Sequence, residues 1–284
     1  VEKGLQIEIP PRAKVIRVLM DELTRLASHQ LWWGAMAMDV GALTPFFHAF
    51  REREAINDIM EETCGARLTM NYIVPGGVMV DLHPHFQQSV KDFISLFKSK
   101  IDEYDELVTE NVIFQSRMKG IGFLSKEDAI SYGCTGPTAR GSGLNCDIRK
   151  LYPYEVYSQL EFEEIIETAG DCFARYLVRL KEMRQSLFIV EQLIDNIPEG
   201  DFQAKTKAVL KLPKGEFYSR TETARGEFGV YIVSEGGATP YRIKFRSPGF
   251  SNLSALDHMT KGHKIGDLVA IMGTLDLVIP DIDR

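Results

Sequence analysis

The sequence predicts a mainly α-helical protein with a small antiparallel β portion, an α+β fold organised as an antiparallel bundle of long helices. Two observations predict this fold. Apolar residues recur with helical spacing in several long segments before residue 194, and beyond residue 213 they alternate with polar residues, as in strands. At 284 residues the chain can bury a large core. We expect residues 1–200 to form the bundle and residues 201–284 a small sheet with C-terminal helices, packed on the bundle as one unit.

The helices are predicted from apolar stripes bounded by proline, glycine or capping residues. Proline is tolerated in a first helical turn but disfavours helix in the residue before it, so prolines bound the first helix at both ends. Ser125 opens a capping box in which Asp128 replaces the usual glutamate. We expect helices from Pro11 to before Pro45, from Phe46 to Cys64-Gly65, from Phe86 to Val108, from Ser125 to Gly133, from Phe173 to Ile194, from a cap at Ser251 or Asn252 to Thr260, and from Asp267 to Val278.

The β portion is predicted from alternation on both sides of a turn. Val230 and Ile232 alternate with polar residues, and so do the apolar residues of segment 241–245. The glycines of segment 235–237 lie between them, which predicts an antiparallel hairpin.

Asp39 is unusual because it lies within the most apolar of these segments. In a helix it shares one face with Trp32, Met36 and Leu43. A carboxylate beside apolar side chains loses hydration, which raises its pKa and makes it a candidate proton donor or acceptor. The alternative is an ion pair with an arginine of a neighbouring helix, and the residues alone favour this structural role. His29 lies about 15 Å from Asp39 along the helix axis, so the two cannot touch.

Residues 133–150, GCTGPTARGSGLNCDIRK, are expected to form an irregular loop. The lysine of a P-loop is missing, which disfavours a phosphate site. Long irregular loops in compact domains are often functional, so a binding or interface role is favoured. The segment His83-Pro84-His85 could offer two imidazoles to a metal, but no third ligand is near, so a simple loop is favoured there.

Composition excludes several classes of protein. The net charge of −7 argues against a nucleic-acid partner, because such proteins carry a basic face. No apolar stretch reaches roughly 18 residues, so no membrane-spanning helix is expected. The cysteines form no CxxC pair, so we expect no metal on this chain. The lack of an export signal indicates reduced thiols in the cytosol, and the start at Val1 looks like a cut through a longer protein.

Three long motifs in order carry a family resemblance: ASHQLWWGAMAMDVGALTPFFHAFRERE, GPTARGSGLNCDIRK and TETARGEFGVYIVSEGGATPYRIKFRSPGF. Together with the final VIPDIDR, they resemble the 49 kDa, or D, subunit of respiratory NADH:quinone oxidoreductase (complex I). This family is related to the large subunit of nickel–iron hydrogenases, which implies that fold. Asp281-Ile282-Asp283-Arg284 stands where a hydrogenase carries nickel-binding cysteines, so neither metal nor hydrogenase activity is expected.

The resemblance implies a quinone-reduction cavity shared with the B subunit, which carries the terminal iron–sulfur cluster. Asp39 matches the cavity aspartate that takes part in quinone protonation, and His29 matches a histidine with a structural or proton-relay role. Quinone-binding positions would be Ala35, Asp39, Phe47 and Val278, and cavity or interface positions would be Arg140, Asp147, Arg149 and Arg225, the last in an Arg-Gly element like that of hydrogenases.

The same resemblance implies that quinone is a substrate and that NAD and flavin bind elsewhere in the complex. Partners would be the B subunit, the C subunit and other complex I subunits, in the peripheral arm on the cytoplasmic face of the bacterial inner membrane, with membrane contact through the complex. The family's quinone-contacting motifs resembling HPSTHG and RMDY do not occur here, so the isolated fragment is not expected to be active. Thr69 stands where many members have a histidine, which implies a lower-potential cluster suited to menaquinone.

Two other functions stay open from the sequence. One is the equivalent subunit of a related ferredoxin- or coenzyme F420-dependent quinone or phenazine oxidoreductase. The other is a non-catalytic scaffold subunit, in which Asp39 is only a buried ion-pair member.

Overall fold

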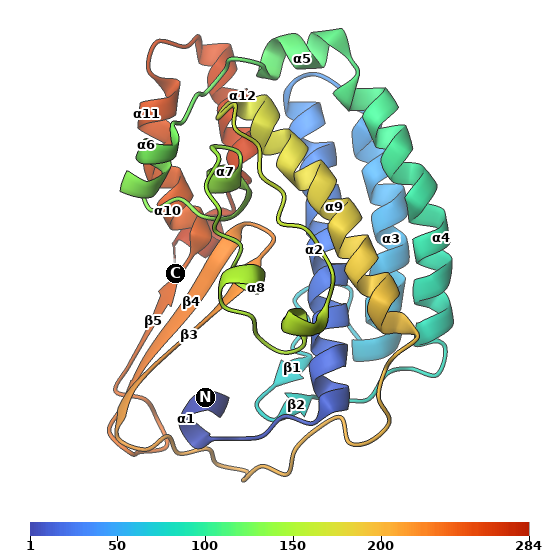
Figure 1. Cartoon of the computed structure of the whole chain (residues 1–284), viewed down its shortest axis with the longest axis vertical. Coiled ribbons are helices and arrows are strands. Elements are labelled where there is room, and N and C mark those ends of the chain that lie inside the picture. The colour runs from blue at the N-terminus through green and yellow to red at the C-terminus, as the bar shows by residue number, and fades with distance from the viewer. Residues whose placement is uncertain (284) are drawn as a thin grey trace.

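Four long helices stand side by side in the computed structural model, which describes residues 1–283 (Figure 1). They are α2 (Pro11–Asp39), α3 (Thr44–Cys64), α4 (Phe86–Tyr104) and α9 (Cys172–Ile194). A three-stranded sheet and the C-terminal helices lie along one side of this bundle, and both chain ends are on that side (Figure 1). The predicted fold class, mainly helical with a small antiparallel β portion, is confirmed.

The first two long helices pack closely because of one small residue. Gly34 of α2 faces α3, and a Cβ placed there would lie 3.0 Å from both the Phe46 Cα and the Ala49 Cβ. A larger residue would therefore push the two helices apart. The α3 helix ends at Gly65, whose φ of 75° is left-handed and whose N–H bonds to the carbonyl of Glu61, as expected for a helix C-terminus.

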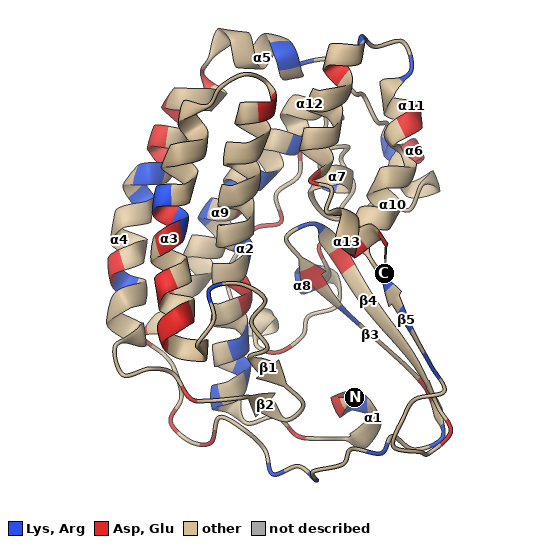
Figure 2. Cartoon of the chain, turned by 180° about the vertical axis from the view of Figure 1, so that it is seen from behind, with Lys and Arg blue, Asp and Glu red and all other residues tan. Residues whose placement is uncertain are grey.

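The interior of the bundle is aromatic on the α4 side. The predicted amphipathic stripe of α4 is buried. Tyr104, the last residue of the helix, stacks on Trp33 of α2 with ring centroids 3.9 Å apart. The helix continues as a π-helical turn, Asp105–Thr109. Charged residues of both signs lie along α3 and α4 (Figure 2).

The sheet has the order β3-β4-β5 with antiparallel pairing throughout: β3 (Gly215–Thr223), β4 (Gly226–Ser234) and β5 (Arg242–Arg246). The predicted hairpin is confirmed as β4 and β5, and β3 is a further strand that the alternation did not predict. A separate short hairpin is formed by β1 (Ile73–Val74) and β2 (Gly77–Val78).

Short helices fill the remaining connections. The segment expected to be an irregular loop contains α7 and α8, and most of it is buried, so that expectation is corrected. The helix expected from a Ser251 or Asn252 cap begins earlier, because Pro248 supplies its first turn after Ser247. The short helices are α1 (Glu2–Leu5), α5 (Val112–Met118), α6 (Lys126–Ser131), α7 (Gly136–Arg140), α8 (Ile148–Leu151), a 3₁₀ turn (Tyr157–Gln159), α10 (Pro248–Ser254), α11 (Leu256–Thr260), α12 (Ile265–Leu275) and α13 (Ile279–Ile282).

The C-terminal part does not stand apart from the bundle. α12 packs directly on α2 and α9, although it follows the sheet in the chain. The division at residues 200 and 201 stays a prediction.

Candidate functional site

An open pocket of about 440 Å³ lies between the C-terminal half of α2 and α12. Most of its lining is apolar, with a small number of polar groups, which is the usual character of a small-molecule site. The lining residues are Leu31, Trp32, Ala35, Met36 and Asp39 of α2, Val269, Met272 and Gly273 of α12, Asp276, Leu277 and Val278 after α12, and Arg225 of the β3–β4 turn.

Asp39 is the last residue of α2 and lies at this pocket. Its side chain is exposed, so the expectation of a carboxylate inside an apolar stripe is corrected. The helix stops at Asp39 and Leu43 falls outside it, 54% exposed. Partial burial still raises the pKa of Asp39. Among residues 1–283 Asp39 has no hydrogen bond or ion pair, and the alternative of an arginine partner is not observed within this part of the chain.

Arg225 and Asp276 close one side of the pocket. The Nε of Arg225 donates to the backbone oxygen of Asp276 at 3.0 Å, and its Nη2 donates to the Oδ1 at 3.1 Å. Asp276 terminates α12 in a left-handed conformation with a φ of 54°. The indole Nε1 of Trp32 donates to the carbonyl of Gly273 at 2.7 Å. The Trp32 bond joins α2 to α12, and the Arg225 bonds join the β3–β4 turn to the C-terminal end of α12, so the lining segments of the pocket are tied to one another.

The expected quinone-binding positions are only partly brought together. Ala35 and Val278 line the same pocket as Asp39, from segments more than 200 positions apart in the chain. Phe47 does not line it, because it points outward from the first turns of α3 and is 62% exposed. Whether any of these residues contacts a quinone stays a prediction.

His29 is fully buried between α2 and α9, away from the pocket lining. Its Nε2 lies 2.9 Å from the Oε2 of Glu182. Burial lowers the pKa of His29, although Glu182 opposes the shift. The imidazole is therefore neutral at pH 7.

Arg140, Asp147 and Arg149 are buried inside the chain, each 1% exposed, so their expected place at a cavity rim or subunit interface is corrected. Arg140 pairs with Glu182 at 2.9 Å and with Glu222 at 2.8 Å, and Arg149 pairs with Asp147 at 2.7 Å. The physical reason is that segments distant in the chain converge here, so that Arg140 and Arg149 find carboxylate partners within the same chain.

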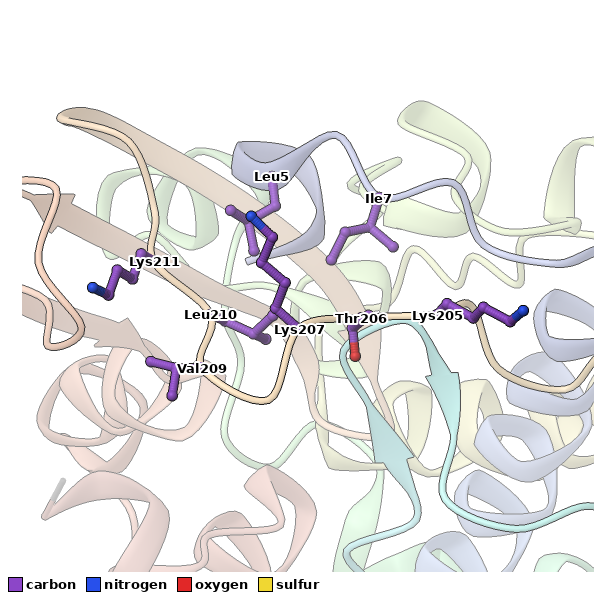
Figure 3. A pocket seen from close by; sticks show the side chains of 8 residues that line it. All are labelled: Leu5, Ile7, Lys205, Thr206, Lys207, Val209, Leu210 and Lys211. Carbon is purple, nitrogen blue, oxygen red and sulfur yellow. The ribbon is translucent and has the colours of Figure 1, made fainter.

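A second hollow, of about 470 Å³, lies where the N-terminal segment meets the loop after α9 (Figure 3). Leu5, Ile7, Val209 and Leu210 give it an apolar floor, and its charged lining residues are the lysines of the 205–211 segment. It contains neither a carboxylate nor a histidine, so proton chemistry favours the pocket at Asp39 although the two hollows are similar in size.

The part of the chain that the structure describes contains no group of three or more His, Cys, Asp or Glu side chains able to hold a metal ion. No helix within residues 1–283 is both long and apolar enough to cross a membrane. Of the segment expected to replace hydrogenase cysteines, Arg284 lies outside the described residues.

Comparison with known proteins identifies the family. The family model described as "Respiratory-chain NADH dehydrogenase, 49 Kd subunit" matches residues 39–284. The chain belongs to this 49 kDa subunit family. The C/D subunit of NADH-quinone oxidoreductase from Bacteroides thetaiotaomicron is 56% identical over 284 residues, covering all of this chain and 54% of the relative. The D 2 subunit of NADH-quinone oxidoreductase from Solibacter usitatus is 47% identical, covering all of this chain and 77% of the relative.

Some of these relatives are much longer than this chain, so membership of the 49 kDa family does not by itself show the activity of the whole protein for this chain. The chain spans about half the length of the C/D relatives that it matches. The resemblance found in the motifs is confirmed as a family membership. The activity and partners of the whole protein are proposals for this chain.

Sequence reasoning missed the α12 side of the pocket in this 49 kDa family member. Val269, Met272 and Asp276 follow one another at spacings of three and four, which places them on one helix face, and that periodicity was the available signal. Nothing local indicated that this face meets α2, because the contact joins segments more than 200 residues apart.

Proposed function

We propose that this chain forms one wall of the quinone-reduction site of a proton-translocating NADH:quinone oxidoreductase. The pocket between α2 and α12 would receive the quinone head group. The proposal rests on one observation: the carboxylate of Asp39, which is unpaired among residues 1–283, lies at a largely apolar pocket, and partial burial raises its pKa. A displaced pKa in such a pocket is typical of proton-transfer groups.

The chemistry divides between this chain and its partners. Reduction of a quinone to a quinol takes two electrons and two protons. The electrons would come from an iron–sulfur cluster on the B subunit, with NAD and flavin further away in the complex, and this chain would itself bind no cofactor. Asp39 would exchange a proton with a quinone oxygen, while Trp32 and Met36 provide apolar contact with the ring.

The place of the chain in the cell follows from the same proposal. We place it in the peripheral arm of the complex on the cytoplasmic face of the bacterial inner membrane, in contact with the B and C subunits. The names of the relatives, all subunits of NADH-quinone oxidoreductase, support this assignment.

Substitution of Asp39 in the assembled complex tests the proposal. Asp39→Asn keeps the size of the side chain but removes its proton exchange, so we expect quinone reduction to slow by about 100-fold or more, the usual contribution of a general acid or base. The measurement is NADH:quinone reductase activity of the purified complex, with the amount of each subunit determined in parallel. Asp39→Glu should recover part of the activity because it restores the carboxyl group.

Asp92→Asn is the matched control. Asp92 is an exposed aspartate on α4 that does not line the pocket, and its replacement should leave turnover unchanged. Full activity of an assembled Asp39→Asn complex would contradict the proton-transfer role of Asp39 and favour a scaffold role for the chain.

A further inference from the structure

Gly273 is a helical glycine that neither the backbone nor the packing requires. It lies in the last turn of α12, and its φ is outside the left-handed region that favours glycine. A Cβ placed on it would make only ordinary van der Waals contacts, of 3.5 Å or more. At Gly34, by contrast, a Cβ would lie 3.0 Å from atoms of α3, so packing requires the glycine there.

Alanine at position 273 would favour the helix, because glycine loses more backbone freedom on folding. The carbonyl of Gly273 accepts the indole N–H of Trp32 at 2.7 Å, but a backbone carbonyl can accept this bond whatever side chain its residue carries. The nearest neighbours of the missing side chain are Met36 and Asp39. Glycine therefore gives up helix stability here and leaves a space beside these two residues.

The space lies in front of the Asp39 carboxylate. A Cβ on Gly273 would be 3.6 Å from the Oδ2 of Asp39 and 3.5 Å from the Cγ of Met36. The Oδ2 therefore faces the bare backbone of α12 across the pocket. Among residues 1–283 this carboxylate has no hydrogen-bond or ion-pair partner, so its oxygens are free to bond a ligand. Met36 is 1% exposed and forms an apolar floor next to it.

The rest of the α12 wall carries side chains. Of the α12 residues that line the pocket, Val269 and Met272 have apolar side chains that are 44% and 41% exposed, and only Gly273 has none. The wall is therefore apolar with one notch, and the notch is beside Asp39. A planar ring that enters edge-on between α2 and α12 can use this notch to bring a carbonyl oxygen against the carboxylate, while its faces contact the apolar walls.

Resting on the proposed function, we propose that Gly273 determines which quinones the pocket accepts. The missing side chain leaves room for the oxygen-bearing edge of the ring, so that a quinone carbonyl oxygen reaches the Oδ2 of Asp39. An O–H···O hydrogen bond spans about 2.5–3.0 Å, so a methyl carbon 3.6 Å from this Oδ2 would occupy the place of the ring edge. Groups attached beside the carbonyl enter the notch together with it, and Gly273 limits their size. Gly273 is thus a specificity-determining residue that moves no proton.

The test compares Gly273→Ala with the wild type in the purified complex, with the amount of each subunit determined in parallel. The added methyl group should raise the KM for a decyl-benzoquinone by about 10-fold, the usual effect of one misplaced methyl group in an apolar pocket. The kcat should stay unchanged, because the methyl group hinders binding and leaves Asp39 in place. The unfolding temperature should not fall, because alanine favours the helix. A merely structural role for Gly273 would change the unfolding temperature and not the KM alone.

A second readout tests selectivity directly. Two decyl-benzoquinones that carry either methyl or methoxy groups beside a carbonyl differ in the size of the group that enters the notch. Gly273→Ala should shift the ratio of their kcat/KM values towards the methyl compound by about 10-fold. Gly273→Val should shift this ratio further, because its side chain is larger.

Gly266→Ala is the matched control, because it makes the same substitution in the same helix. Gly266 does not line the pocket, and a Cβ there would meet only the Nη2 of Arg117, at 3.8 Å. The KM and the quinone selectivity of this variant should equal those of the wild type. A rise in KM as large as that of Gly273→Ala would overturn the inference.

The remaining outcomes separate this inference from the proposed function. An unchanged KM and an unchanged selectivity in Gly273→Ala overturn the inference even if Asp39→Asn abolishes turnover. Loss of assembly in Gly273→Ala also overturns it, because packing would then require the glycine. A raised KM in Gly273→Ala together with full activity of Asp39→Asn would keep Gly273 as the size limit of the quinone pocket and contradict proton transfer by Asp39 instead.

Discussion

At the scale of single residues, His29 shows how burial decides the state of a side chain. The ring is wholly buried and bonds through Nε2 to Glu182. Burial alone would raise the pKa of Glu182, but Arg140 and the bond from His29 bring it well below its ordinary value. The carboxylate is ionised and His29 is neutral, so His29 donates this hydrogen bond.

The stability of the protein should therefore decrease in mild acid through His29. Its pKa is lower when folded than the 6.5 of an unfolded chain, so below about pH 6.5 the unfolded state binds a proton that the folded state does not. The free energy of unfolding should fall by up to about 1.4 kcal/mol per pH unit from this residue. Denaturant unfolding of the wild type and His29→Gln between pH 5 and about 8 measures it.

The variant provides its own control. At pH 8 His29 is neutral in the folded and the unfolded state, so the difference in the free energy of unfolding between variant and wild type gives the structural cost of the substitution. Below that pH, the difference between the two proteins in the slope of the free energy of unfolding against pH gives the contribution of His29 titration. Parallel curves for the two proteins would show that His29 is not the group responsible.

Asp39 and His29 also show what sequence can predict at this scale. The motif around Asp39 identified it as a pocket residue, and the structure places it at a pocket. The partner of His29 was not predictable, because Glu182 is 153 positions away and only tertiary packing joins them.

At the scale of elements, a network of buried ion pairs connects α2, α7, α8, α9 and β3. Arg149 pairs with three of its carboxylates, Glu22, Asp147 and Glu182. Its guanidinium also lies 5.2 Å from the Phe162 ring centroid. Segment 133–150, expected from the sequence to be an irregular loop with a binding or interface role, instead connects these elements inside the chain.

Removal of Arg149 should strongly destabilise the fold. Arg149→Met keeps much of the side-chain volume but leaves buried carboxylates without their cation, a change that costs about 3–5 kcal/mol. Thermal and denaturant unfolding measure the loss. The matched control is Arg67→Met, because Arg67 also pairs with three carboxylates but is 38% exposed, and its loss should cost less than about 1 kcal/mol. If Arg149→Met and Arg67→Met lose the same free energy of unfolding, burial of the Arg149 ion pairs is not the cause of the destabilisation.

The long helices were the most predictable elements, because their stripes repeat over many turns and their ends carry proline or glycine. The short helices α7 and α8 were not predictable, since four or five residues are too few for a periodic pattern. β3 was missed because its apolar and polar residues do not alternate strictly, and its pairing with β4 fixes it as a strand.

At the scale of the whole molecule, the candidate site lies at a junction of distant parts. Its two main walls, α2 and α12, are joined by the Trp32 hydrogen bond, and Arg225 of the β3–β4 turn bonds to Asp276 at the end of α12. The sequence could not predict this junction from local patterns, although the family resemblance named Ala35 and Asp39 of α2 and Val278 after α12. The helices at this end of the molecule also expose apolar side chains: Val112 and Ile113 of α5 are 79% and 74% exposed, and Ile265 of the adjoining α12 is 89% exposed.

Such an exposed apolar group is typical of a surface that a partner covers. Under the proposed function, Ile265→Glu should weaken association with the cluster-bearing subunit while leaving the fold intact, because Ile265 has little contact to lose within this chain. Co-purification of the two subunits measures association, and the unfolding temperature measures the fold. Val209→Glu is the control, since Val209 is also exposed, at 57%, but lies by the second hollow in the loop after α9 (Figure 3). Undiminished co-purification of Ile265→Glu would show that this end of α12 is not the covered surface.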